Sequence, residues 1–116
     1  MPFDIENIIP EFFGTFLFIF LILLITNNSP FGSSFVGNFT TFICVGFALI
    51  FGLVLSFSIS TLLGANSKFS GHLNPAVTLT MAIKNNDYPL LFYWIPQLLA
   101  GAIAIFLFKM HSNNSV

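Results

Sequence analysis

The residues of this sequence that could perform acid–base or nucleophilic chemistry are few and far apart. Glu11, Cys44 and His72 are the strongest candidates, but at their spacing they do not form a nucleophile, a base and an orienting group. His72 and His111 are too far apart in sequence to indicate a metal site. We therefore predict that the protein is not an enzyme and that it holds no metal ion or cofactor.

A short polar run has a different chemical character. Residues 70–75 read Ser-Gly-His-Leu-Asn-Pro, and residues 76–83 are mostly apolar. The side-chain oxygen of Asn74 can accept a backbone N–H from the first turn of a helix that follows it. Pro75 suits the first helical position, because its missing N–H costs nothing there. This pattern predicts a short helix over residues 75–83.

The composition is that of a membrane protein. Hydrophobic residues make up 56% of the 116 residues, charged residues make up 6%, and the mean hydropathy is +0.94. Soluble domains carry about 25% charged residues. The net charge is −1 and there is no basic run, so we expect no nucleic-acid partner. Cys44 is the only cysteine, so no internal disulfide can form.

Three long apolar stretches predict three membrane-spanning helices. They cover about 8–26, 39–63 and 89–108, and each is near or above the roughly 20 residues that a spanning helix needs. Glu11 is the only charged residue within them. Turn-forming residues fill 27–38, where we expect no helix. The predicted fold is an all-α, multi-pass integral membrane protein in contact with lipid.

The apolar run over 76–83 is too short to cross a bilayer. One interpretation is a surface amphipathic helix that joins the second and third spans. The run has only Thr78 and Thr80 as polar residues and no basic face to meet lipid headgroups. These features favour a re-entrant half-helix, meaning a short helix that together with its loop enters the membrane and returns to the same side.

Several sequence motifs resemble those of one membrane-protein family. Residues 70–79 are similar to the first Asn-Pro-Ala region of the MIP family of aquaporins and glycerol facilitators, normally written S-G-x-H-x-N-P-A-V-T. Three further matches follow the family's order, and together the four cover nearly the whole chain, 1–116, as a single half-repeat. They are Glu11-Phe12-Phe13-Gly14-Thr15, Phe51-Gly52-Leu53, and Gln97 with Gly101-Ala102.

The resemblance implies a passive pore. In the family, two half-repeats of opposite orientation place two short helices end to end at the membrane midplane. The positive ends of the helix dipoles repel cations there, and the Asn side-chain amides donate hydrogen bonds to the passing oxygen. By the resemblance, Asn74 would be this donor, and Pro75 and Ala76 would shape the junction between the two helices.

The resemblance also implies roles for other residues. The carbonyl groups of Gly71, His72 and Leu73 would accept hydrogen bonds along the pore wall, and Phe51 would line the outer constriction. Glu11 would bury under the re-entrant loop and accept its backbone N–H groups, together with the His72 ring. An alternative for Glu11 is a place at the membrane edge, within reach of headgroup water.

The sequence departs from the family pattern near these residues. One residue is missing between Gly71 and His72, the stretch after Gly64 is longer than usual, and Gln97 is separated from Gly101 by one residue more. The chain also ends after three predicted spans, so we expect a partner to supply the second half-repeat. A partner half-channel would do this.

An antiparallel homodimer would do so as well. The lysines permit it: with the N-terminus inside, Lys68 and Lys84 would lie on one side of the membrane and Lys109 on the other. In such a dimer Val77 of the opposite copy would take the position of the family's filter arginine, and each constriction would lack a fixed cation.

We therefore expect a channel, or half of one, for water or small neutral solutes such as glycerol. The first alternative is a non-conducting remnant or a regulatory subunit that packs against a full-length channel. The second is an unrelated small dual-topology transporter or holin-like pore, which would have no reason to contain residues 70–79 as written.

Overall fold

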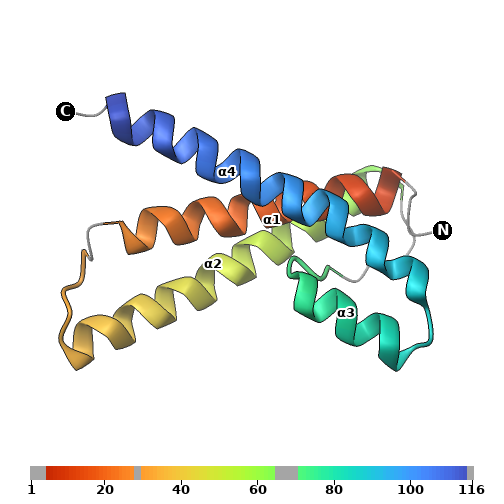
Figure 1. Ribbon diagram of the computed structural model, residues 1–116, viewed down its shortest axis with the longest axis horizontal. Coiled ribbons are helices and arrows are strands. Elements are labelled where there is room, and N and C mark those ends of the chain that lie inside the picture. Colours follow the sequence, from red (N-terminus) through yellow and green to blue (C-terminus); the bar gives the residue numbers. More distant parts are fainter. Residues whose placement is uncertain (1–4, 28–29, 65–70, 115–116) are drawn as a thin grey trace.

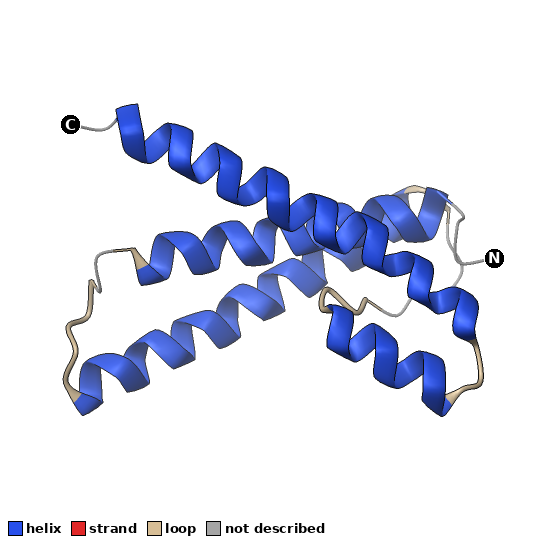
Figure 2. Cartoon of the chain, in the orientation of Figure 1, coloured by secondary structure: helices blue, strands red, loops and turns tan. Residues whose placement is uncertain are grey.

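The structure is a computed structural model that describes residues 5–27, 30–64 and 71–114. Its described part is built from helices joined by loops, with no strand (Figures 1 and 2). Three helices are long and apolar enough to cross a membrane, and a shorter one stands beside them, which confirms the predicted fold class. The elements are α1 (Ile5–Thr26), α2 (Phe35–Leu62), α3 (Pro75–Lys84), the 3-10 helix η1 (Tyr88–Tyr93) and α4 (Trp94–Asn114).

Helix α1 is the centre of the fold. It packs against α2 along one side and against α4 along the other, and Figure 1 shows it between them. Two glycines allow α1 and α2 to approach closely: a Cβ on Gly14 would lie 2.9 Å from the carbonyl oxygen of Gly52. The Ser56 hydroxyl also donates a 2.6 Å hydrogen bond to the carbonyl oxygen of Pro10. Small residues at this crossing therefore replace bulky side-chain packing, as is common between membrane helices.

Helix α2 begins four residues before the predicted start at Phe39. The expectation that 27–38 holds no helix is wrong, because α2 starts at Phe35. The physical reason is a helix cap: the Ser34 side chain accepts the backbone N–H of Gly37 at 3.1 Å. The 28 residues of α2 extend for about 42 Å at 1.5 Å per residue, which exceeds the roughly 30 Å hydrocarbon core.

The third span starts within one residue of the predicted start at residue 89, but its first part is not an α-helix. Its first turns form the 3-10 helix η1, and the α-helix begins only at Trp94. Pro96 explains this change, because it has no N–H to donate to the carbonyl group of Phe92 and its ring clashes with that group in an α-helix. At the other end, α4 continues past the predicted end at Phe108 to Asn114.

Helix α3 begins at Pro75, as predicted, and runs to Lys84. It starts near the middle of the molecule and leads to one end, where η1 turns the chain back into α4 (Figure 1). Its contacts are with η1 and the start of α4. The fold thus holds a short helix whose N-terminus lies half way along the spanning helices.

Candidate functional site

The N-terminus of α3 has the geometry that its sequence predicts. Asn74 has an extended backbone conformation (φ −149°, ψ 125°), and its Oδ1 accepts the backbone N–H of Ala76 at 2.8 Å. Pro75 occupies the first turn. Because the cap uses Oδ1, the Nδ2 group is the part of the Asn74 side chain left to donate, and the residue is exposed. The side chain therefore presents hydrogen-bond donors at the start of α3.

Glu11 of α1 lies beneath the loop that precedes α3. The side chain is fully buried, and its two carboxylate oxygens accept the backbone N–H groups of His72 at 2.6 Å and Leu73 at 3.0 Å. A third donor, Gln97 Nε2, lies 3.2 Å from Oε2. Glu11 is thus buried within the fold and bonded to the loop. Three hydrogen bonds supply the partners that a buried carboxylate needs.

Leu73 fixes the same loop by apolar packing. Its backbone has a positive φ of 57°, which costs a non-glycine residue roughly 1–2 kcal/mol. The side chain is only 1% exposed and lies against the close approach of α1 and α2, since a Cβ added at Gly14 would lie 2.8 Å from Leu73 Cδ2. A Cβ added at Gly52 would lie 3.0 Å from Leu73 Cδ1. Burial of Leu73 offsets its backbone strain.

A chain of buried polar side chains connects the loop, α3 and α4. Gln97 Nε2 donates to Thr78 Oγ1 at 2.8 Å, and Thr78 Oγ1 lies 3.0 Å from His72 Nδ1. All three side chains are 5% exposed or less. Burial lowers the pKa of His72, which favours the neutral imidazole. The ring therefore carries no charge into this apolar surrounding at neutral pH.

Two aromatic residues at the junction of η1 and α4 complete the support. The Tyr93 ring lies 5.1 Å from the His72 ring, between centroids. The indole N–H of Trp94 donates to the carbonyl oxygen of Pro75 at 3.0 Å. The re-entrant element is therefore held from α1 by Glu11, from the end of η1 by Tyr93, and from the start of α4 by Trp94 and Gln97.

Not all of the predicted site residues come together. Residues 71–74 form the supported loop, and Pro75, Ala76 and Val77 follow in the first turn of α3, where the Val77 side chain is 41% exposed. Phe51 is 56% exposed and lines an apolar pocket of about 320 Å³ together with residues of α1 and α2 only. Ser70, the first residue of the motif, lies outside the described residues.

Sequence reasoning gave no role to Thr78, Trp94 or the side chain of Gln97. A signal for them exists, because each carries a hydrogen-bonding group inside a stretch that is otherwise apolar. Such groups are buried in lipid-facing folds only where they find partners. The partners themselves come from other elements, so only the three-dimensional structure identifies them.

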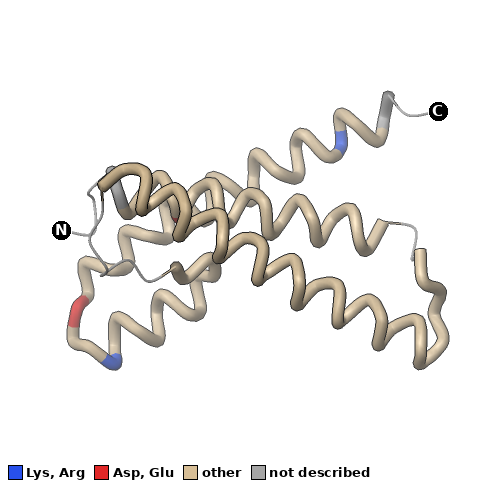
Figure 3. Tube along the Cα trace, turned by 180° about the vertical axis from the view of Figure 1, so that it is seen from behind, with Lys and Arg blue, Asp and Glu red and all other residues tan. Residues whose placement is uncertain are grey.

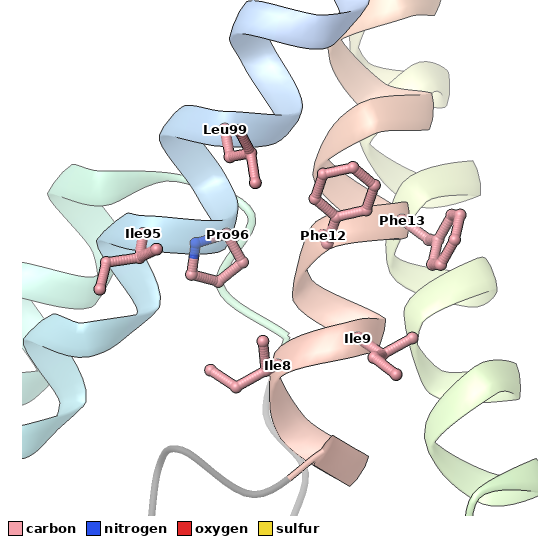
Figure 4. A pocket seen from close by; sticks show the side chains of 7 residues that line it. All are labelled: Ile8, Ile9, Phe12, Phe13, Ile95, Pro96 and Leu99. Carbon is pink, nitrogen blue, oxygen red and sulfur yellow. The ribbon is translucent and has the colours of Figure 1, made fainter.

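An apolar groove between α1 and the start of α4 is a separate feature (Figure 4). It has a volume of about 210 Å³. Its apolar lining offers water no hydrogen-bond partner, so this groove is not the candidate path for a polar solute. The lining residues are Ile8, Ile9, Phe12, Phe13, Ile95, Pro96 and Leu99.

Comparison with known proteins agrees with these features. A probable TIP-type aquaporin of Antirrhinum majus is 33% identical over 118 residues, which cover 96% of this chain and 44% of the relative. The probable TIP-type aquaporin RB7-5A of Nicotiana tabacum is 34% identical over 122 residues, with the same two coverages. Aquaporin TIP2-1 of Arabidopsis thaliana is 33% identical over 106 residues, 85% of this chain and 39% of the relative.

The chain thus spans less than half of the length of these relatives. No solved structure gives a significant match. The sequence pattern of the major intrinsic protein family matches residues 2–116. The chain is an integral membrane protein that belongs to the major intrinsic protein family.

Proposed function

We propose that this chain forms half of the wall of a passive membrane channel for water and small neutral solutes such as glycerol. Asn74 is the central hydrogen-bond donor to the permeating molecule. The loop carbonyl groups of residues 71–73 act as acceptors beside it. Pro75 and Ala76 shape the end of the half-helix.

The observation that carries this proposal is the position of the N-terminus of α3. The ten residues of α3 extend for about 15 Å, which is half of the roughly 30 Å hydrocarbon core. The helix starts near the middle of the molecule, where Asn74 is exposed (Figure 1). If the C-terminus of a helix of this length lies at one membrane surface, its N-terminus lies near the membrane midplane.

Hydrogen bonds and the helix dipole would act together at this point. The start of α3 carries a partial positive charge, equivalent to roughly half an elementary charge, which repels cations. The Nδ2 group of Asn74 donates to the oxygen of water or of a hydroxyl group. A neutral solute with an acceptor oxygen therefore passes, and a cation is disfavoured.

A second half-helix must face the first to close the pore. We propose that a second copy in the opposite orientation supplies it, with Val77 of each copy at the filter position and Phe51 beside it. The positions of the basic residues are compatible with two orientations, because the two described lysines, Lys84 at the end of α3 and Lys109 in α4, lie toward opposite ends of the molecule (Figure 3). Lys68 lies outside the described residues.

Asn74→Asp tests the proposed donor. Aspartate caps a helix as well as asparagine does, so the fold should be retained, but a carboxylate cannot donate to the permeating oxygen. We expect water flux through reconstituted vesicles to fall about tenfold, equivalent to about 1.4 kcal/mol. Asn85→Asp makes the same change at the other end of α3 and should leave the flux unchanged. Equal flux in the Asn74→Asp and wild-type proteins would refute the role of Asn74.

A subunit that packs against another channel without conducting is the alternative function. The apolar groove between α1 and α4 favours it, because a groove of this kind can receive side chains of a neighbouring helix. This alternative predicts that vesicles with the inserted chain alone shrink no faster than protein-free vesicles.

A further inference from the structure

We propose that Trp94 is a positioning residue that holds the first turn of α3 and thereby sets the direction of the Asn74 amide. The proposal rests on the proposed function for the role of Asn74. It deepens that function by naming the residue outside α3 that orients the donor.

The direction of the Asn74 amide follows the direction of the helix. Asn74 Oδ1 is held by the N–H of Ala76 at 2.8 Å, so the amide plane is fixed relative to the first turn of α3. The Nδ2 hydrogens then point along a direction that the helix determines. Any tilt or shift of the first turn redirects these hydrogens, and hydrogen bonds weaken steeply when their angle departs from linearity.

A ten-residue helix does not fix its own position. Isolated helices shorter than about 12–15 residues are marginal in water, and α3 depends on contacts with other elements. Most of its surface is exposed, with Thr78 and Ala82 as its buried residues. Its position must therefore come from a small number of specific contacts.

Trp94 makes such a contact beside Asn74. Its Nε1–H lies 3.0 Å from the carbonyl oxygen of Pro75, the residue that follows Asn74 in the chain. A carbonyl oxygen has two lone pairs, so the Pro75 oxygen can accept the indole N–H and still accept a backbone N–H within α3. Another hydrogen bond from α4 to α3 reaches Thr78, one turn further along. Glu11 holds the loop before Asn74.

The chemistry of tryptophan suits this position. The indole N–H is a donor only. Because the ring is large and rigid, the position of this N–H is closely tied to the backbone of Trp94. Trp94 is half-buried at the first residue of α4, directly after η1. Phenylalanine would keep an aromatic ring there but would remove the bond to Pro75.

Because the chain has a single tryptophan, its indole N–H gives one resonance in a ¹⁵N-labelled sample. We expect slow exchange of this proton with water in the wild-type protein. In Trp94→Phe, the side-chain amide resonance of Asn74, assigned by its loss in Asn74→Asp, should shift. Water flux should fall about fivefold. Tyr88→Phe, an exposed aromatic change in η1, should alter neither the resonance nor the flux.

The results separate this proposal from the proposed function. If the wild-type protein does not conduct, the proposed function fails, and the Asn74 resonance still decides whether Trp94 orients the amide. If Trp94→Phe does not fold, a tryptophan analogue with sulfur in place of the N–H tests the same bond with an unchanged ring size. An Asn74 resonance that stays in place, or an indole proton that exchanges as fast as in free tryptophan, overturns the proposal.

Discussion

Glu11 Oε2 accepts the backbone N–H of Leu73 at 3.0 Å, although the two residues are 62 positions apart in the chain. Together with the bond to His72, this contact joins the first spanning helix to the loop that precedes α3. The carboxylate supplies the acceptors that an irregular segment of backbone needs at membrane depth. One acidic side chain of α1 therefore supplies the hydrogen-bond acceptors for the loop beside the candidate pore residues.

Glu11→Gln should weaken this support. Glutamine has one acceptor oxygen where the carboxylate has two, so its NH₂ group would face a backbone donor of the loop. We expect the free energy of unfolding to fall by about 1–3 kcal/mol. The measurement is a denaturant titration in detergent micelles followed by circular dichroism. Asp87→Asn, the same change at an exposed position, is the control, and an equal effect of the two substitutions would contradict the role of Glu11.

Gly14→Ala should separate α1 from α2. The new methyl group would overlap Ser56 Oγ and lie 2.8 Å from Leu73 Cδ2, so the helix crossing and the loop would both have to move. Overpacking of this kind costs about 1–3 kcal/mol or more. Gly46→Ala is the matched control, because nothing lies within 4 Å of its added carbon and alanine favours a helix by about 0.5–1 kcal/mol. Thermal unfolding should rank Gly46→Ala at or above the wild type and Gly14→Ala below it. A Gly14→Ala variant as stable as Gly46→Ala would refute the close approach of α1 and α2.

Thr78→Val should disrupt the polar chain between His72 and Gln97. Valine has nearly the same shape but no hydroxyl group, so Gln97 Nε2 would lose its 2.8 Å acceptor and His72 Nδ1 its 3.0 Å partner. We expect a loss of about 1–3 kcal/mol of stability. Thr80→Val, on the exposed side of the same helix, removes only a bond within α3 and should change stability by less than about 0.5 kcal/mol. Comparable losses for the two variants would show that the buried hydrogen bonds of Thr78 contribute nothing to stability.

Stability should decline in mild acid because of His72. Burial lowers its pKa below the ordinary value of 6.5, so the unfolded chain binds a proton more readily than the folded protein. The free energy of unfolding therefore falls as the pH drops below about 6.5, and it is independent of this ring at higher pH. Among the described residues, the Thr78 hydroxyl and the Tyr93 ring lie beside the His72 ring, and Glu11 accepts the backbone N–H of His72.

His72→Gln provides the test of this pH dependence. Unfolding between about pH 5 and about pH 8 should show the decline in the wild type and in His111→Gln, whose exposed side chain lies near the end of α4. The decline should be absent in His72→Gln. A decline that persists in His72→Gln would assign the titration to another group.

Local sequence chemistry was sufficient to predict the start of α3. The cap of Asn74 and the place of Pro75 depend on residues within one turn, and both are where the sequence puts them. The spanning helices are predictable for a similar reason, because length and apolarity suffice to identify them. Their ends are less predictable: Ser34 caps α2 early, and Pro96 delays the α-helical part of the third span.

The contacts that support the site could not be predicted from local chemistry. Trp94 and Pro75 are 19 positions apart, and Gln97 and Glu11 are 86 positions apart. Such pairs depend on how α4 lies against α1 and α3, and the periodicity of the sequence does not predict this arrangement. A polar side chain in an apolar segment signals that a partner exists without identifying it.

Osmotic water flux through the wild-type chain tests the proposed channel most directly. Protein reconstituted in liposomes, with insertion and dimer formation shown by chemical cross-linking, is exposed to a hyperosmotic solution, and shrinkage is followed by light scattering. The proposed channel should make shrinkage severalfold faster than in protein-free liposomes, and Asn74→Asp should lose this excess. Shrinkage of the wild-type sample at the protein-free rate, with inserted dimers present, would contradict it.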